Sequence, residues 1–225
     1  MAARIFLLPG FGENNSVYDP LLPYLKDYEV RKVDYPKILS QVPLFNYSGM
    51  EVVKKMIRHY RIQPEDKLIG HSTGGYFAFL IREIQGNEIC MISGFSDCKK
   101  VIPPLPHQWL TTPLLSITGF IKSSISRKYM LDKVKGKPIA KPLMEVMGHF
   151  KDFTNEELFK LSLIITYDEK PISILPNPLR IHAKDDKVVR IPDQEFVEVK
   201  GGHFPMALDL EGVAAALRDF LQKDK

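Results

Sequence analysis

Residues 67–82, KLIGHSTGGYFAFLIR, contain the feature that decides the fold. Lys67–Ile69 is a short run that leads into a glycine, as a buried strand does. Tyr76–Ile81 is apolar nearly all round, as expected of a helix buried against a sheet. Between them lies Gly70-His71-Ser72-Thr73-Gly74, a G-x-S-x-G motif placed between strand and helix. This context predicts a sharp turn that projects the Ser72 hydroxyl outward.

The glycines of this motif have a steric role. The serine of such a turn has a strained backbone, and side chains two residues before and after it would collide. Gly70 and Gly74 remove that collision, and Gly75 lets the helix approach the sheet closely. A merely structural glycine-rich turn does not account for a serine flanked symmetrically. We therefore expect Ser72 to be a nucleophile.

Strand and helix patterns alternate along much of the chain. Short apolar runs bounded by turn residues predict six strands, at Arg4–Leu8, Tyr28–Val33, Lys67–Ile69, Glu88–Ile92, Leu179–Ala183 and Glu195–Lys200. Helical periodicity appears in Ser48–Tyr60, in Tyr76–Ile81 and in a last stripe of Met206, Leu210, Val213, Leu217 and Phe220. This alternation predicts an α/β fold with a mostly parallel central sheet and helices on both faces.

One long segment interrupts the alternation. From about Phe95 to Asp168 no strand pattern is convincing. The segment holds six prolines and a series of apolar residues at helical spacing: Leu110, Leu114, Ile117, Ile121 and Ile125. We expect a core of residues 1–95 and 169–225 with a helical lid of residues 96–168. The alternative is a helical decoration of the surface with no role at any site.

Length and composition bound the class of protein. The chain has 225 residues, of which 44% are hydrophobic and 26% charged, so a single soluble domain is expected. Its two cysteines do not make a disulfide framework. The N-terminal apolar run Ile5–Leu8 is too short for a signal-peptide core or a membrane span. A cytoplasmic location without stable membrane insertion is expected.

Positive charge is concentrated in the segment 98–151. It holds ten lysines and arginines against Asp132 and Glu145, a net charge of +8, whereas the whole chain carries +4. One interpretation is an ordinary solvated surface. The other is an electrostatic attraction for an anionic substrate or surface.

A serine hydroxyl needs a base to become a nucleophile. His203 lies in Gly201-Gly202-His203-Phe204-Pro205, after the last predicted strand and before the last helix. That position is the carboxyl edge of a parallel sheet, where sites of open α/β sheets assemble. His203 is therefore the expected base.

The base needs a carboxylate that orients its ring and stabilises its charged form. Asp185 and Asp186 both follow the predicted strand Leu179–Ala183 at its carboxyl end. We expect Asp185 to be the acid and leave open that Asp186 takes this role. The chain order is then Ser72, Asp185, His203, as in hydrolases with a nucleophile elbow.

An oxyanion hole needs backbone donors aimed at the developing negative charge. Thr73 N–H should be one donor, and Phe11 N–H, in the loop after the first strand, should be the other. Substrate contacts are expected from four residues beside these groups or in the lid, namely Gly10, His71, Trp109 and Phe204.

The stretches LLPGFGEN, IGHSTGGYFAF, RIHAKDDKVV and GGHFPMAL, with the helix that follows, resemble the α/β-hydrolase superfamily in order and spacing. The resemblance covers about residues 4–95 and 175–222 and implies a compact, esterase-like fold with a Ser-Asp-His triad. There are three departures. Pro9 stands where many members have His, His182 stands where Gly is usual, and Asp34-Tyr35-Pro36 lacks a Gly-x-Gly-x-Ser continuation.

These residues favour hydrolysis of a small carboxylic ester or thioester through an acyl-enzyme on Ser72. Two alternatives remain, namely a triad-dependent carbon–carbon hydrolase or lyase, and a non-catalytic binding protein. The acyl pocket, or else the core of the lid, is expected from the apolar residues Trp109, Leu114, Leu115, Ile117, Phe120 and Ile121. Neither metal-ligand spacing nor a nucleotide-binding glycine fingerprint is present, so no metal or cofactor is expected. The expected partner is a small, possibly anionic substrate and not a nucleic acid. The sequence does not indicate an oligomeric state.

Overall fold

The structure is a computed structural model that describes residues 4–44, 47–102, 108–168, 173 and 175–222. At its centre is a parallel six-stranded sheet of order β2-β1-β3-β4-β5-β6. The strands are β1 (Arg4–Leu8), β2 (Glu29–Lys32), β3 (Lys67–His71), β4 (Ile89–Ile92), β5 (Leu179–Ala183) and β6 (Val197–Val199). All six predicted strands are present, and the predicted α/β class is confirmed.

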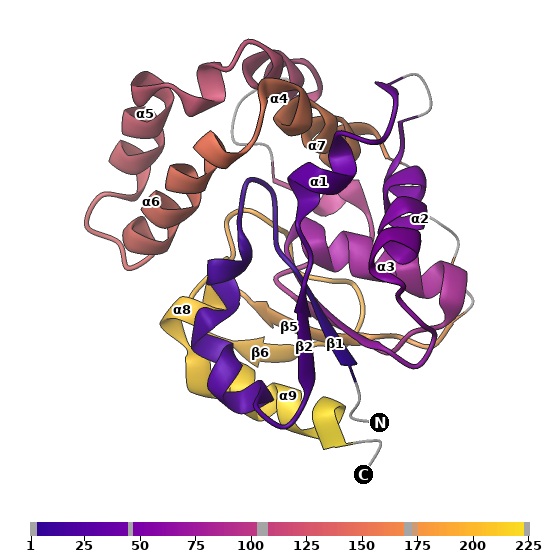
Figure 1. Cartoon of the computed structure of the whole chain (residues 1–225). Coiled ribbons are helices and arrows are strands. Elements are labelled where there is room, and N and C mark those ends of the chain that lie inside the picture. The colour runs from indigo at the N-terminus through magenta and orange to yellow at the C-terminus, as the bar shows by residue number, and fades with distance from the viewer. Residues whose placement is uncertain (1–3, 45–46, 103–107, 169–172, 174, 223–225) are drawn as a thin grey trace.

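The sheet separates two apolar cores. Phe6 and Leu8 of β1 point into a core shared with α1 (Tyr35–Leu39), α2 (Gly49–Tyr60) and α3 (Thr73–Gln85). Ile5 and Leu7 point into the opposite core, shared with the 3-10 helix η1 (Asn15–Leu25), α8 (Pro205–Leu208) and α9 (Leu210–Gln222). Successive side chains of a strand point to opposite faces, so β1 contributes to both cores. Figure 1 shows helices on both sides of the sheet, as predicted.

The helix boundaries follow local signals. The Ser48 side chain accepts a hydrogen bond from Glu51 N (3.3 Å) and caps the start of α2, which ends at Arg61 in the left-handed region. The last predicted stripe, from Met206 to Phe220, is divided into α8 and α9 at Asp209. The Asp209 carboxylate accepts a hydrogen bond from Lys200 N (2.7 Å) and so ties this break to the end of β6.

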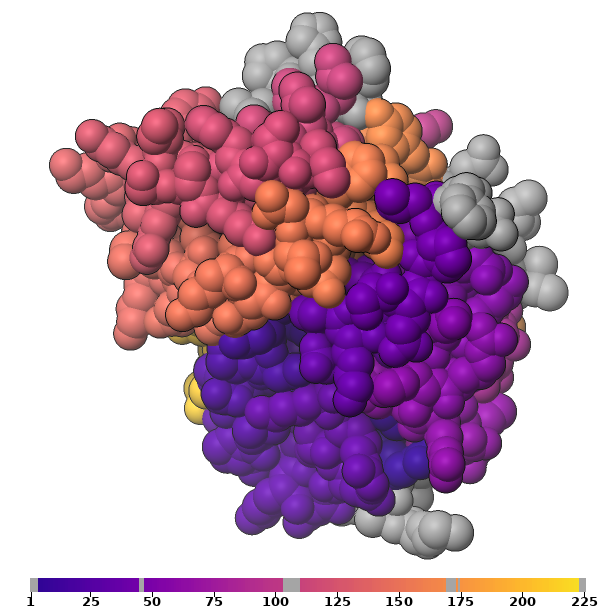
Figure 2. Space-filling view, turned by 45° about the horizontal axis from the view of Figure 1, so that its top comes forward, coloured from indigo at the N-terminus to yellow at the C-terminus, as the bar shows by residue number. Residues whose placement is uncertain are grey.

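Residues 96–168, which we call the helical insertion, lie between β4 and β5. They form η3 (Cys98–Lys100), α4 (Gln108–Ile117), η4 (Phe120–Lys122), α5 (Ser124–Val134), α6 (Ala140–His149), η5 (Phe150–Asp152) and α7 (Asn155–Tyr167). α7 buries Leu158, Leu161 and Ile164 in the core, and α4 packs on α7. The insertion lies opposite the two chain termini and overhangs the core (Figures 1 and 2). Its role as a lid remains a prediction.

The apolar spacing from Leu110 to Ile125 does not correspond to one helix. α4 ends at Ile117, and Gly119 has a φ of 75°, a conformation that ends a helix. Thr118 N donates to Leu114 O (3.1 Å), and Gly119 N donates to Ser116 O (3.0 Å). The chain therefore changes direction between α4 and α5.

α3 approaches the sheet closely because its first turn carries glycines. A Cβ atom added to Gly74 would lie 1.8 Å from Leu8 O, and one added to Gly75 would lie 3.1 Å from the Cα of Gly94. The first distance is impossible for real atoms and involves backbone on both sides. The helix and β1 would have to separate to admit any side chain at residue 74.

We expect Gly74→Ala to lower the free energy of unfolding by about 3 kcal/mol, because β1 and α3 must move apart. The matched control is Gly148→Ala in α6, where an added Cβ meets no atom within 4 Å. That control should raise the free energy of unfolding by up to about 1 kcal/mol, through helix propensity. Urea unfolding measures both, and similar stabilities for the two variants would contradict the close packing.

Candidate active site

Ser72 occupies the turn between β3 and α3. Its φ of 51° is one of three positive values among the described non-glycine residues. Ser72 N donates to Ile92 O (3.0 Å), and Ser72 O accepts from Gly75 N (2.9 Å). A Cβ atom added to Gly70 would lie 2.3 Å from Gly74 O, so the turn closes only with glycine there. The strained turn expected from the motif is present.

His203 reaches Ser72 from the loop between β6 and α8. Its Nε2 lies 3.0 Å from Ser72 Oγ, a hydrogen-bonding distance. Gly201 and Gly202 precede it with φ values of 98° and 59°, which bend the loop back over the sheet. Ser72 and His203 are only 7% and 4% exposed, so the pair is shielded from bulk water.

The carboxylate that holds His203 belongs to Asp186 and not to Asp185, which corrects the expected acid. Asp186 Oδ2 lies 2.9 Å from His203 Nδ1, and its Oδ1 accepts hydrogen bonds from Val188 N and Val189 N. Burial raises the pKa of Asp186, but the neighbouring His203 and these hydrogen bonds lower it by more, so its pKa lies below the ordinary value. The buried carboxyl group therefore favours its charged form.

A tight turn after β5 explains the correction. Asp186 N donates to Ala183 O (3.1 Å), which directs the Asp186 side chain inward and leaves Asp185 exposed. Asp185 Oδ1 accepts instead from Gly202 N (3.2 Å) and braces the loop that carries His203. Two adjacent aspartates after a strand do not reveal which side chain points inward, so the sequence alone does not distinguish Asp185 from Asp186 as the acid.

His71 is not a substrate contact, contrary to expectation. Its ring is completely buried, with Nδ1 2.8 Å from Glu13 Oε2 and Nε2 2.8 Å from the carbonyl oxygen of His203. Both neighbours are acceptors, so only the doubly protonated ring donates to both. Burial lowers the pKa of His71, but Glu13 and the His203 carbonyl raise it by more, and the net shift is upward.

Glu13 is the residue of this site that sequence reasoning missed. The same Oε2 atom accepts a hydrogen bond from Gly10 N (2.6 Å), in the loop after β1. A Cβ atom added to Gly10 would lie 2.8 Å from Glu13 Oε2 and 3.0 Å from Ser72 Cβ. The backbone of Gly10 therefore lies close to both residues and leaves no room for a side chain. Glu13 and His71 thus join the Gly10 loop, the Ser72 turn and the His203 loop.

The two amides expected to bind an oxyanion lie at this junction. Thr73 is the first residue of α3, where a backbone N–H has no acceptor within the helix. Phe11 lies between Gly10 and Gly12, and its ring packs edge-on against Phe150 of the insertion (5.9 Å between centroids). The insertion therefore covers the loop that would supply the second donor. The role of both amides remains a prediction.

The other expected substrate contacts have different outcomes. Phe204 is buried, with its ring 5.4 Å from that of His203, and it lines an open pocket between η1 and α6. The Trp109 side chain lies outside the described residues. Leu114, Ile117 and Phe120 are exposed, so they are not the core of a lid, and they do not line the pocket beside Phe204.

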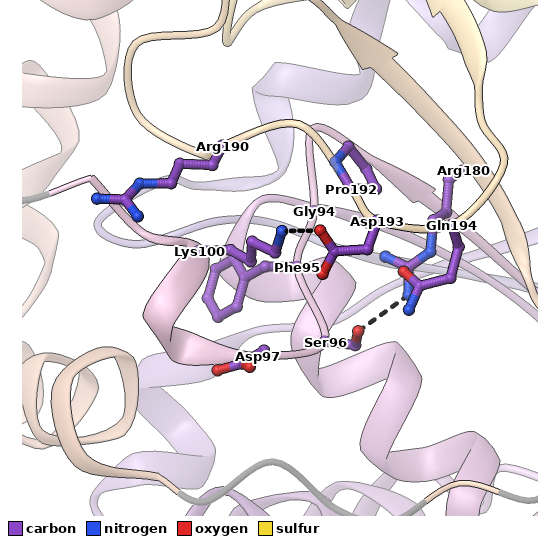
Figure 3. Close-up of a pocket in the computed structure, with 10 residues that line it drawn as sticks. All are labelled: Gly94, Phe95, Ser96, Asp97, Lys100, Arg180, Arg190, Pro192, Asp193 and Gln194. Carbon is purple, nitrogen blue, oxygen red and sulfur yellow. Dashed lines mark hydrogen bonds and ion pairs between the residues drawn. The ribbon is translucent and has the colours of Figure 1, made fainter.

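A second, very small pocket lies between the ends of β4 and β5 (Figure 3). Arg180 donates to Ser96 Oγ (3.0 Å), and Lys100 pairs with Asp193 across it. Burial and the nearby Arg82 lower the pKa of Arg180 to about 10. None of the residues that line this cavity belongs to the cluster around Ser72.

Several solved structures match this architecture over nearly the whole chain. A hydrolase from Oleispira antarctica has a TM-score of 0.77 at 17% identity, covering 99% of this chain and 92% of its own. A carboxylesterase of Nitrososphaera gargenis has a TM-score of 0.75 at 15% identity, covering 100% and 92%. An esterase from Exiguobacterium antarcticum has a TM-score of 0.70 at 15% identity, covering 99% and 94%.

These likenesses establish the class by shape: the chain has the α/β-hydrolase fold, as its sequence motifs indicated. No protein-family model and no curated protein matches the sequence. The solved relatives are hydrolases and esterases, and at these identities they show the fold alone.

The buried Glu13–His71 pair predicts a particular pH dependence of stability. Because the folded-state pKa of His71 is raised, its protonated form contributes stability that is complete below the unfolded-state pKa, about 6.5. That stability is lost as the pH rises through the higher folded-state pKa. We expect Glu13→Gln to lower the free energy of unfolding by about 3–5 kcal/mol near pH 6, and by less in alkaline solution.

Urea unfolding of the wild type and Glu13→Gln across this pH range tests the pair. The control is Glu51→Gln, whose carboxylate pairs with Lys54 on the surface of α2 and is 42% exposed. It should leave stability nearly unchanged at every pH. If the loss in free energy of unfolding caused by Glu13→Gln did not change with pH, the contact with Glu13 would not raise the pKa of His71.

Proposed function

We propose that the protein is a serine hydrolase that cleaves a small carboxylic ester or thioester through an acyl-enzyme on Ser72. The observation that carries this proposal is the continuous hydrogen-bonded series from Ser72 Oγ to His203 (3.0 Å) and on to Asp186 (2.9 Å). Nucleophile, base and oriented acid in this order are what acyl transfer by serine requires. The fold of known hydrolases and esterases supports the same class.

In the proposed cycle, Ser72 Oγ attacks the substrate carbonyl while His203 Nε2 takes its proton. The Asp186 carboxylate stabilises the imidazolium that forms, and the amides of Phe11 and Thr73 donate to the oxyanion. Collapse of the tetrahedral intermediate breaks the bond to the leaving alcohol or thiol, which receives the proton from His203. A water molecule, deprotonated by His203, then attacks the acyl-serine, releases the acid and restores Ser72.

The substrate must reach a serine that is covered in this structure. Phe150 packs against Phe11, and a Cβ atom added to Gly12 would collide with the Phe150 ring, so the insertion closes directly over the oxyanion loop. The pocket beside Phe204, a neighbour of the proposed base His203, is a candidate space for an acyl or leaving group. Movement of the Phe150 segment is the simplest route by which an ester enters.

Ser72→Ala should reduce turnover of a short p-nitrophenyl ester by about 10⁴-fold or more, because no other group there supplies the nucleophile. Its unfolding transition should stay close to that of the wild type. A fluorescent organophosphonate should label the wild type and not the variant, with the label found on Ser72 by peptide mass spectrometry. Retention of full activity in the variant, or labelling elsewhere only, would overturn the mechanism.

The two aspartates provide a matched test of the acid. Asp186→Asn should reduce kcat by about 10³-fold or more, because a neutral amide no longer fixes the His203 ring or stabilises its charged form. Asp185→Asn keeps a side-chain oxygen that can accept from Gly202 N, so it should reduce kcat less than about tenfold. The reverse ranking in steady-state kinetics would restore Asp185 as the acid.

A further inference from the structure

In α4 small residues are buried and large apolar residues are exposed, which is the reverse of the usual arrangement. Its buried residues include Thr112, Pro113 and Ser116, whereas Leu110 and Leu114 are 52% and 53% exposed. The buried side faces α7, and the Ser116 hydroxyl is satisfied there by donating to Thr112 O (2.9 Å). Small residues allow two helices to approach closely, and this approach turns the large apolar residues outward.

The exposed apolar residues of α4 lie on one face of the helix. Leu110, Leu114 and Ile117 are spaced by four and three residues, so they share one face of α4. Six of the fifteen exposed large hydrophobic residues found among the described residues lie within 110–129. We call these six the apolar stripe: Leu110, Leu114, Ile117, Phe120, Ile125 and Tyr129. Such a concentration differs from the scattered apolar residues of an ordinary surface and indicates a binding face.

α5 points to the same conclusion. None of its eleven residues is buried, although Ile125 and Tyr129 are apolar in character. Helices of this length are marginal in water unless an apolar face is packed. The overhanging position of this part of the insertion is visible in Figure 2. The outer layer of the insertion therefore offers apolar side chains that the described core does not cover.

The segment that carries the apolar stripe is strongly basic. Residues 108–149 hold seven lysines and arginines against Asp132 and Glu145, a net charge of 7 − 2 = +5. Six of these cations are exposed, namely Arg127, Lys128, Lys133, Lys135, Lys137 and Lys141. A partner of this face must accept apolar side chains and also carry negative charge.

We propose that the α4–α5 face of the insertion binds peripherally to the surface of an anionic phospholipid bilayer. Apolar side chains can enter the headgroup–acyl boundary while the surrounding cations meet anionic headgroups. A second copy of the chain fits less well, because a twofold contact would press this basic face against itself. None of the helices in the described part of the chain has the length and apolar character of a membrane span.

The test uses full-length Ser72→Ala protein, so that hydrolysis of lipid does not complicate binding and the result does not depend on the proposed activity. Vesicles of phosphatidylcholine alone are compared with vesicles in which about a third of the lipid is phosphatidylglycerol. We expect at least tenfold stronger co-sedimentation with the anionic vesicles. Raising the salt concentration should weaken it, because salt screens exposed charges.

Variants separate the apolar contribution from the charge. Leu110→Ser with Leu114→Ser should reduce binding at least tenfold, while Ile84→Ser, at an equally apolar and 43% exposed site on α3, should not change it. Lys128→Glu with Lys135→Glu should reduce binding at least 25-fold, since each cation near an anionic surface contributes about fivefold. The charge-matched control, Lys26→Glu with Arg58→Glu on the core, should change it less than about threefold.

Absence of binding to anionic vesicles, or binding unaffected by Leu110→Ser with Leu114→Ser in a protein that still unfolds cooperatively, would overturn the proposal. Equal binding to neutral and anionic vesicles would remove the role of charge. A dimer in sedimentation equilibrium that the same two substitutions dissociate, without lipid binding, would assign the face to a second copy instead.

Discussion

The strained turn at Ser72 is the constraint on which the rest of the structure depends. A serine with a φ of 51° persists only where its surroundings determine it fully. Here Ser72 N bonds to Ile92 O at the end of β4, while Gly74 lies against Leu8 O at the end of β1. The carboxyl ends of three adjacent strands therefore meet at one residue, with no side chain between β1 and the helix at Gly74. Loops leaving those strands are brought to Ser72 for the same reason.

Two imidazole–carboxylate pairs lie side by side beneath the insertion. The rings of His71 and His203 are 5.0 Å apart, and each nitrogen that faces an acid is within 2.9 Å of it. A cationic His71 alone would oppose the formation of a second imidazolium at His203, because like charges at this distance repel in a buried setting. Glu13 offsets that charge and also holds the Gly10 loop. In the proposed cycle, the network would position the site and keep it close to electrically neutral while His203 takes up a proton.

Features encoded over a few residues were predictable from the sequence, whereas those that depend on distant contacts were not. The strands and the turn at Ser72 follow from apolar periodicity and from glycine spacing. The choice of Asp186 depends on how one tight turn directs its side chain, which two adjacent aspartates do not reveal. Glu13 depends on a contact with His71, 58 residues later, and nothing near residue 13 signals it. The outward direction of Leu114 and Ile117 was not predictable, because apolar spacing identifies a helix face and does not say whether that face points inward.

The exposure of large apolar side chains on α4 follows from the way the layers of the insertion pack. α7 is fixed because Leu158 and Leu161 are buried in the main core, and α4 rests on the opposite side of that helix. α4 forms a third layer, and only one of its sides faces other protein layers. That side carries small residues such as Ser116, which permit close contact with α7. Its large apolar side chains then have no protein layer beyond them among the described residues. Their exposure costs free energy in water that a bilayer surface would recover, and the basic residues around them select a surface of negative charge.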